Sequence, residues 1–441
     1  MPDNKPAAPP DKLLADWIRR DYAALAESTL DRDAATWART TCRACGAGGL
    51  SDVLSLGVMP PANAFLNPAQ LSAPEPRFPL DLMLCEHCGM VQLRHVVPPE
   101  LLFRAYSFFT SMSMAMSAHF AALMNDHARR RVPPGGLVVE VGSNDGTALS
   151  SIQRRDVRVL GVDPARNVSV MAAARGVPTV AEFFTEPLAR EIRRVAGPAS
   201  LIVGCNVLGH IDDLDQVCRG IDALLAPEGA FVFEVPYLGK LLENVEFDTV
   251  YHEHLSYFAV RPLVALFSRH GLRLDELEMF PVHGGTIRGV VVRGEGCSDA
   301  VSAWIDAEER AGMATPAPFR ALAARTAEMG ERLRAWLAGQ KAHGRRIWGY
   351  GAPAKGTVLL NHFAIGTDLL PVVVDSTPAK QGLHVPGTRQ PILAPAEVAA
   401  QRPDAVLVLA WNHAREIFGR EAAYRAGGGH LLTPDLREIG P

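Results

Sequence analysis

The sequence predicts a multidomain α/β protein in which two Rossmann-like units follow a small metal-binding domain. Three observations support this fold class. Two Cys-x-x-Cys pairs stand near the N-terminus, apolar segments alternate with helical segments between 133 and 229, and a second alternation of this kind begins at 346. Strands that alternate with helices are typical of a parallel sheet. A chain of 441 residues is too long for a single core, so we expect several domains.

Composition and charge exclude several classes of protein. Hydrophobic residues make up 48% of the chain and charged residues 21%, which is typical of a globular protein. A net charge of -4 gives no reason to expect a nucleic-acid partner. No apolar run approaches the roughly 18 residues of a membrane helix, and the first residues lack the apolar core of a secretion signal. Seven cysteines, four of them paired, indicate metal binding in a reducing compartment, so we expect a cytoplasmic protein.

The first forty residues form an extension to the globular part. After a Pro/Ala-rich start, Leu13, Leu14, Trp17 and Ile18 recur with a roughly helical rhythm. This pattern predicts a short amphipathic helix, which either packs on its own chain or forms a dimer contact. Both a monomer and a homodimer therefore stay open.

The two cysteine pairs predict a zinc site. Cys42 and Cys45 form the first pair, Cys85 and Cys88 form the second, and each pair is followed by glycine. Four thiolates close a tetrahedral zinc site and leave no open position, so the ion is expected to be structural. His87 and His95 are possible substitute ligands that the second pair makes unnecessary. The long gap between the pairs requires strands and a loop.

The segment at 102–120 is rich in methionine and aromatic residues, which suits a core. It also holds a cluster of hydroxyl groups, and buried hydroxyl groups need partners. The segment could therefore face a polar ligand. The cluster consists of Tyr106, Ser107, Thr110, Ser111 and Ser113.

The region from 133 to 229 predicts a parallel sheet with a ligand at its carboxyl edge. A strand at 137–141 runs into a glycine turn and a helix at 147–154, and a second strand ends at Asp163 and Pro164. A third strand, from 199, ends near Asn206, and a fourth at 229–235 follows a Pro-Glu-Gly turn.

The glycine turn favours S-adenosylmethionine over NAD as the ligand. Such a turn lets a ligand approach the backbone, and an acid after the second strand suits ribose hydroxyls. The GxGxxG motif of pyrophosphate binders is absent, because Ser143 and Asn144 follow Gly142. NAD stays the alternative. The expected donor-binding residues are Glu140, Gly142, Asn144, Asp145, Gly146, Asp163, Pro164, Asn206 and Val207.

The stretch at 251–258, YHEHLSYF, concentrates imidazoles, a carboxylate and phenols. A zinc-protease motif would need histidine at 256, where Ser256 stands, so that interpretation fails. Histidine has a pKa near 6.5 and suits proton transfer at neutral pH. Structural histidines satisfied within a core stay the alternative. The sequence at 283–292 then predicts a late antiparallel strand of the same sheet.

A helical segment at 298–340, broken near Pro316 and Pro318, leads to the second α/β unit. There a strand, a glycine turn around Gly351, Lys355 and Thr357 precede a helix. The order of residues differs from a P-loop, but a lysine and backbone amides at a helix start form an anion site. Further parallel strands are expected at 370–375 and 405–412. We therefore expect a phosphate-bearing ligand here.

With these motifs placed, the chain from about 40 to 441 resembles the S-adenosylmethionine-dependent C-methyltransferases that modify nucleotide-linked keto-deoxysugars. The resemblance rests on the paired CxxC, EVGSNDG at 140–146, NVLGHIDD at 206–213, YHEHLSYF at 251–258, HGGTIR at 283–288, GYGAPAKG at 349–356 and LAWN at 409–412.

The resemblance implies a central class I methyltransferase Rossmann-like domain, a small N-terminal zinc-binding domain and a C-terminal Rossmann-like domain that holds the nucleotide-sugar. The expected boundaries are 1–40 for the extension, 41–100 for the zinc-binding domain, 101–297 for the methyltransferase domain, 298–340 for the helical linker and 341–441 for the C-terminal domain.

The resemblance also implies the roles of individual residues. His254 would be the base, Glu253 would orient groups around the sugar, Tyr251 would donate a hydrogen bond and His210 would share the pocket. Expected substrate contacts are Tyr106, Phe108, Ser111, His252, Tyr257, His283, Arg288, Gly351, Lys355, Thr357 and Asn412. Phe108 departs from the family, which usually has a second tyrosine there.

The expected reaction removes a proton from the carbon next to a ketone and methylates the resulting enolate. The expected acceptor is a nucleotide-linked keto-deoxysugar, with dTDP as the nucleotide, in natural-product deoxysugar biosynthesis. Two alternatives stay open. One is the same chemistry on a different small carbonyl compound, and the other is a nucleotide-sugar-binding protein that does not methylate.

Overall fold

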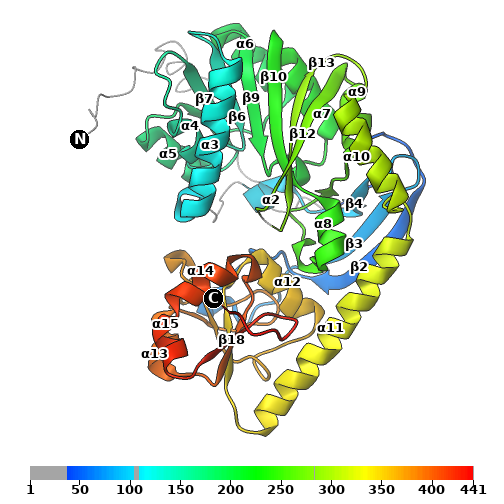
Figure 1. Ribbon diagram of the computed structural model, residues 1–441. Coiled ribbons are helices and arrows are strands. Elements are labelled where there is room, and N and C mark those ends of the chain that lie inside the picture. Colours follow the sequence, from blue (N-terminus) through cyan, green and yellow to red (C-terminus); the bar gives the residue numbers. More distant parts are fainter. Residues whose placement is uncertain (1–36, 104–108, 283, 441) are drawn as a thin grey trace.

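The computed structural model describes residues 37–103, 109–282 and 284–440, and Figure 1 shows how its main sheets are arranged. The helix predicted around Leu13 and Ile18 lies outside these residues, as do Tyr106, Phe108 and His283. Within the described residues no helix is both long enough and apolar enough to cross a membrane.

The N-terminal sheet has four strands in the order β11-β4-β3-β2. Strands β2 (Leu50–Met59), β3 (Phe78–Cys85) and β4 (Val91–Leu93) are antiparallel neighbours, as the gap between the cysteine pairs requires. The last strand, β11 (Ser256–Tyr257), comes from the end of the 251–258 stretch and pairs with β4. The segment that carries His254 is therefore built into the sheet that carries the cysteines. A separate pair joins β1 (Trp37–Ala38) to β5 (His95–Val96).

The central sheet has seven strands in the order β12-β13-β10-β9-β6-β7-β8, and the five from β10 to β8 are parallel. All residues of β6 are buried, as expected for a parallel strand covered on both faces. The strands are β6 (Leu137–Val141), β7 (Arg158–Val162), β8 (Thr179–Val180), β9 (Ala199–Cys205), β10 (Leu225–Pro236), β12 (Leu272–Phe280) and β13 (Thr286–Arg293). The predicted late antiparallel strand is confirmed as β13, which pairs with β10.

The helices between residues 99 and 310 connect the strands of this sheet or lead into and out of it (Figure 1). They are α2 (Pro99–Phe103), α3 (Met114–Arg131), α4 (Thr147–Ser150), α5 (Arg166–Ala174), α6 (Glu186–Ala196), α7 (Leu214–Leu224), α8 (Leu238–Asn244), α9 (Val260–Ser268) and α10 (Asp299–Arg310).

Two local expectations for this sheet were wrong. The helix predicted at 147–154 ends at Ser150, because the Ser151 hydroxyl bonds the Ala148 carbonyl and Asn125 accepts the amide of Gln153. The Pro-Glu-Gly turn at 227–229 lies inside β10, where the pairing register shifts between Leu225 and Ala230. At the end of α4 the tertiary hydrogen bond from Gln153 to Asn125 overrides a local preference for helix, and in β10 the strand continues through an irregularity in its pairing.

The C-terminal sheet has five parallel strands in the order β16-β15-β14-β17-β18. The strand expected at 370–375 shrinks to two residues after Pro371, which has no amide hydrogen to donate. The strands are β14 (Ile347–Tyr350), β15 (Val373–Val374), β16 (Ile392–Leu393), β17 (Ala405–Val408) and β18 (His430–Leu432), with helices α11 (Ala317–Ala342), α12 (Ala354–His362), α13 (Ala396–Gln401), α14 (Ala414–Arg420) and α15 (Ala422–Ala426).

The N-terminal and C-terminal sheets share one apolar core. Leu80 of β3, Phe319 of α11 and Leu359 of α12 belong to the same buried cluster, together with Phe247 from the loop after α8. Figure 1 shows α11 running from the central part of the molecule along the side of the C-terminal sheet. This shared core fixes the loops that lie between the sheets.

Candidate active site

The four predicted metal ligands come together. The Cys42 and Cys88 sulfurs are 3.5 Å apart, those of Cys45 and Cys85 are 3.7 Å apart, and all four lie within 4.8 Å of one another. Sulfur atoms at about 2.3 Å from a tetrahedral zinc ion are about 3.8 Å apart. The cluster therefore fits a zinc ion, and its four thiolates leave no position for water or a substrate.

The turn after β6 is folded around Asp163. One carboxylate oxygen accepts the Asn144 amide at 2.8 Å and the other accepts the Ala165 amide at 2.9 Å, across Pro164. Gly142, Asn144 and Gly146 all have positive φ, which only glycine and asparagine adopt readily. These hydrogen bonds and φ values fix the conformation of the turn at the carboxyl edge of the sheet.

The turn approaches the loop after β9. A Cβ atom on Gly142 would lie 3.1 Å from the Val207 side chain, and Asn206 next to it also has positive φ. Gly146, the N-cap of α4, is equally close to Ala172. The predicted donor-binding residues thus lie on three neighbouring loops, except Glu140, which lies near the end of β6.

Three buried polar atoms in this region have no hydrogen-bond partner among the described residues. They are Oε2 of Glu140, Oγ of Ser143 and Oδ1 of Asn206. Buried polar atoms are normally paired, so these atoms fit a polar ligand that S-adenosylmethionine would supply. Burial, and then the carboxylates of Asp163 and Asp145, raise the pKa of Glu140. A surface with this acidic character favours a cationic sulfonium compound and disfavours the pyrophosphate of NAD.

The hydroxyl-rich segment before α3 is hydrogen-bonded to the turn after β6. The amide of Thr110 donates to Asn144 at 3.0 Å, and the amide of Ser111 donates to Asp145 at 3.3 Å. Asp145 also accepts the Thr147 hydroxyl at 2.6 Å. Ser111 therefore lies beside the turn after β6, and its contact with the methyl-accepting substrate stays a prediction.

His254 is held in one tautomer. Its Nδ1 lies 2.8 Å from the Thr249 carbonyl, which can only accept, so Nδ1 carries the hydrogen. In the neutral ring the lone pair is then on Nε2, as a base requires. The ring lies 3.9 Å from that of Tyr251 and 5.0 Å from that of His210, centroid to centroid. The structure thus brings these three predicted residues together.

His210 ends a short 3-10 turn directly after β9, at Leu208–His210. Its ring stacks on Phe103 with centroids 5.4 Å apart. Burial lowers the pKa of His210 to about 4, so this imidazole is neutral at physiological pH.

Glu253 lies between the N-terminal and C-terminal parts of the molecule. It is 3% exposed and accepts a hydrogen bond from Asn63, in the loop after β2, at 2.7 Å. Burial raises the pKa of Glu253 to about 7, against the opposing charge of Lys380 from the C-terminal part. Its Oε2 has no partner among the described residues. This carboxyl group can therefore exchange a proton near neutral pH.

The turn after β14 is folded around Asp375. Its carboxylate accepts the amides of Ala352 and Thr377, each at 2.7 Å. Gly351 has φ 89°, and a Cβ atom there would lie 2.5 Å from that of Ala410. Lys380 donates to the Ala352 carbonyl at 2.8 Å. Two lysines are thus next to this turn: Lys380 bonds its backbone, and Lys355 follows it in the first turn of α12.

Lys355 has no hydrogen-bond partner for its buried ammonium group among the described residues, and neither has the hydroxyl of Thr357. The ammonium lies 3.9 Å from the centre of the Trp411 ring. Burial lowers the pKa of Lys355, and the carboxylates of Asp248 and Glu246 oppose this effect. An anionic ligand would satisfy both partnerless groups.

Other predicted substrate residues have different surroundings. The Nε2 of His252 lies 3.2 Å from the Phe78 carbonyl, and Arg288 forms an ion pair with buried Glu234 at 2.6 Å. The ring of Tyr257 lies 6.4 Å from that of His254, and its buried hydroxyl has no partner among the described residues. Asn412 follows Trp411 in a 3-10 turn. Their roles in substrate binding stay predictions.

Sequence reasoning missed four polar residues at this site. Asp375 could have been found, because it ends a buried strand as Asp163 does. Asn63 and Lys380 have no motif around them, and Asp248 precedes the 251–258 stretch without belonging to it, so the sequence carries no signal for their place.

Comparison with known proteins gives three family models along the chain. They are described as "Putative zinc binding domain" over residues 42–103, "Methyltransferase domain" over 117–277 and "C-methyltransferase C-terminal domain" over 281–434. The chain is 39% identical over 399 residues to the C-methyltransferase NovU of Streptomyces niveus, and this match covers 89% of the chain and 94% of that protein.

Solved structures resemble one part of the chain. Magnesium protoporphyrin IX methyltransferase from Synechocystis PCC 6803 matches with 14% identity and a TM-score of 0.33, over 41% of this chain and 88% of that one. The N-methyltransferase NodS from Bradyrhizobium japonicum matches with 13% identity and a TM-score of 0.31, over 41% of this chain and 96% of that one. Similarities of this size carry no argument about the site.

Proposed function

The chain belongs to the C-methyltransferase family that includes NovU, and we propose that its acceptor is a nucleotide-linked keto-deoxysugar. Membership in the family makes the protein an S-adenosylmethionine-dependent methyltransferase with a zinc-binding domain. The proposal concerns the acceptor, its biosynthetic setting in natural-product deoxysugar formation, and the residues that perform the reaction.

The observation that carries the proposal is the pair of partnerless groups on α12. Lys355 and Thr357 offer a buried ammonium and a buried hydroxyl beside a glycine turn. A phosphate group matches this set, whereas a small neutral ketone would leave the cation unpaired. A dTDP-linked sugar would place its diphosphate here and extend its sugar toward Glu253.

Carbon methylation requires a carbon nucleophile, which forms beside a ketone when a base removes the neighbouring proton. We assign this step to Nε2 of His254, because its Nδ1 hydrogen is committed to the Thr249 carbonyl. The carbon–hydrogen electron pair then moves into the enolate, and the enolate carbon would form its new bond to the donor's methyl group as the sulfur–methyl bond breaks and S-adenosylhomocysteine leaves. S-adenosylmethionine, when bound, supplies the electrophilic methyl group.

Two groups can stabilise the enolate oxygen. The ring of Tyr251 lies 3.9 Å from that of the base, centroid to centroid, and Glu253 is protonated over part of the physiological range because the pKa of this residue is raised to about 7. A hydrogen-bond donor aimed at a developing oxyanion typically lowers the barrier by about 3 kcal/mol. His210 remains neutral beside His254 and so does not repel the proton that the base acquires.

The test is an incubation of the protein with labelled S-adenosylmethionine and a panel of acceptors. We expect transfer to carbon of dTDP-linked keto-deoxysugars and none to the same sugars without the nucleotide. Equal transfer to small ketones would instead identify a different carbonyl acceptor. No transfer, with a thermal shift by the nucleotide-sugar but none by S-adenosylhomocysteine, would identify a binding protein and overturn the proposal.

None of the seven cysteines, all of which are among the described residues, forms a disulfide bond. This state suits a reducing compartment, and we place the reaction in the cytoplasm. Fractionation of cells that express the protein would test this assignment.

A further inference from the structure

Arg43 lies between the zinc ligands Cys42 and Cys45, in the segment 42–45 that we call the zinc turn. Its side chain forms hydrogen bonds with other segments of the chain. The side chain is completely buried, although it belongs to a turn at the edge of the N-terminal sheet. Its Nε donates to the Asp212 carboxylate at 2.9 Å. Its Nη1 donates to the carbonyl of Leu255 at 3.2 Å and to that of Leu93 at 2.8 Å.

The partners of Arg43 flank both imidazoles of the site. Leu255 is the residue after His254, and Asp212 lies two residues after His210. The guanidinium therefore binds the loop of the base and the loop of its neutral neighbour at once. The centroids of the two rings are 5.0 Å apart, and Arg43 is joined to both loops.

Backbone hydrogen bonds make this connection stiff. The carbonyl of Leu255 also accepts the Leu93 amide at 2.9 Å, and the Leu255 amide donates to the Gly209 carbonyl at 2.6 Å. Arg43 is itself fixed by its own amide, which donates to the Gln92 side chain at 2.8 Å. The zinc turn, strand β4 and the two histidine loops thus form one hydrogen-bonded unit.

We propose that Arg43 is a positioning residue, which transmits the rigidity of the zinc turn to the spacing and orientation of His210 and His254. The proposal rests on the assignment of His254 as the base. Arginine suits this role because its planar fork serves several acceptors in fixed directions, which lysine cannot do. Zinc then has a function in this protein beyond holding the N-terminal sheet together.

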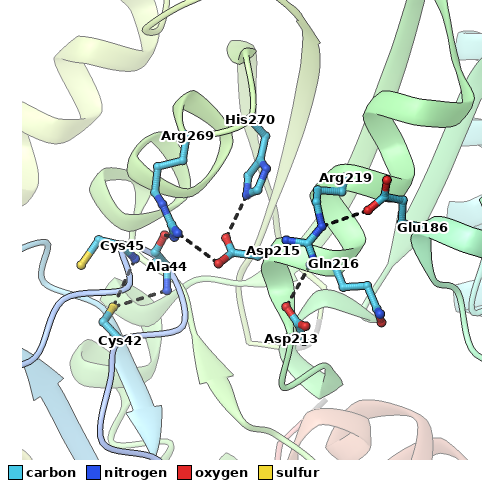
Figure 2. Close-up of polar contacts among 10 residues, drawn as sticks. All are labelled: Cys42, Ala44, Cys45, Glu186, Asp213, Asp215, Gln216, Arg219, Arg269 and His270. Atoms are coloured by element: carbon cyan, nitrogen blue, oxygen red, sulfur yellow. Dashed lines mark hydrogen bonds and ion pairs between the residues drawn. The ribbon is translucent and has the colours of Figure 1, made fainter.

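Arg269 provides a matched control, which Figure 2 shows. It too ties the zinc turn to the central part, because it donates to the Ala44 carbonyl at 2.8 Å and to Asp215 at 3.0 Å. Asp215, which also bonds His270, lies on α7. Arg269 therefore makes a comparable bridge that ends on a helix and not on a histidine loop.

The first measurement is hydrogen exchange with mass spectrometry on the full-length, zinc-loaded protein. We compare Arg43→Gln and Arg43→Lys with Arg269→Gln. In the Arg43 variants we expect exchange in 206–213 and 249–256 to be about tenfold faster, with unchanged zinc content and S-adenosylhomocysteine affinity. In Arg269→Gln both segments should exchange as in the wild type.

The second measurement is turnover with the acceptor that the wild type methylates. A displacement of about 1 Å at the base costs about 100-fold in rate. We therefore expect kcat of Arg43→Gln to fall about 100-fold while KM for S-adenosylmethionine stays constant. Arg269→Gln should lose less than threefold, on the order of the small effects typical of surface ion pairs.

Exchange in both segments equal to that of the wild type, in a folded and zinc-loaded Arg43→Gln, would overturn the proposal. Faster exchange along the whole chain in both arginine variants would overturn it too, because that result indicates a general structural role. If Arg43→Gln does not fold, Asp212→Asn provides the same test for 206–213. Failure of the wild type to methylate any acceptor affects the proposed function and leaves the exchange result interpretable.

Discussion

The turn after β6 and the turn after β14 have the same backbone construction and differ in the charged side chains beside them. In each, an acid at the end of the next strand accepts two amides, one from the glycine turn and one from two residues after itself. The acids are Asp163 and Asp375. The first turn adds Glu140 and Asp145, whereas the second adds Lys355 and Lys380.

Because the backbone construction is shared, we expect the charged side chains beside each turn to select its ligand. Carboxylates around the first turn suit a cationic methyl donor, and lysines around the second suit a phosphate. Glu253 and His254 lie on one loop, and β11 at the end of this loop pairs with β4 of the N-terminal sheet. The comparison yields four predictions.

The largest effect is expected at the base between the two turns. His254→Asn keeps a side chain that can donate to Thr249 but removes the proton acceptor, so kcat should fall about 10²- to 10⁴-fold. Binding of S-adenosylhomocysteine and of dTDP, measured by calorimetry, should not change. Turnover within threefold of the wild type, on the order of a surface substitution, would remove His254 from the mechanism.

Glu253 should make stability depend on pH. Its pKa is raised from 4.5 to about 7, so the folded protein binds the proton more tightly than the unfolded chain. The stability from this group is complete below pH 4.5 and is lost as the pH rises through about 7. Glu253→Gln has no such loss. The variant should therefore gain up to about 3 kcal/mol relative to the wild type across this range.

Urea unfolding at several pH values measures this gain. Glu278→Gln, on the exposed side of β12, gives the baseline for removing a carboxyl group. A constant difference between Glu253→Gln and the wild type would contradict the raised pKa of Glu253.

Substitution of Asp163 or Asp375, the acids on which the two turns are folded, tests whether each turn binds its own ligand. Asp163→Asn should weaken S-adenosylhomocysteine about 10- to 100-fold and leave dTDP unaffected, because hydrogen bonds to a charged group contribute about 1.5 to 3 kcal/mol. Asp375→Asn should do the reverse. Titration calorimetry of both variants with both ligands measures this. If either variant weakened both ligands equally, the two turns would not be separate sites.

The smallest effect is expected at Lys355. Lys355→Ala should weaken dTDP about tenfold, since one charged partner of a phosphate is lost, and should reduce the salt dependence of binding. S-adenosylhomocysteine should bind as before. Lys341→Ala, exposed near the end of α11, is the control. Unchanged affinity for dTDP in Lys355→Ala would remove the phosphate role.

Much of the fold and of the donor site follows from local sequence. The four cysteines, the glycine turn at 142–146 and Asp163 carry short-range constraints, namely thiolate spacing, positive φ and a strand that ends in an acid. The parallel order of the central strands follows from their alternation with helices. Other features have no local cause. The length of α4 depends on Asn125, which accepts the amide of Gln153 beyond the end of the helix, and the length of β15 depends on Pro371, which cannot donate to the sheet.

The sequence by itself determined which chemical groups this protein has: four cysteines that cluster as zinc ligands, a glycine turn followed by acids, the imidazoles of His210 and His254, and a lysine-bearing turn. Only the tertiary structure decided which of these groups contact one another. Strand β11 joins the sheet of the zinc ligands, Asn63 and Lys380 converge on Glu253, and Arg43 reaches both histidine loops. The physical reason is burial, since a buried polar group must find partners wherever packing places them, whatever their distance along the chain.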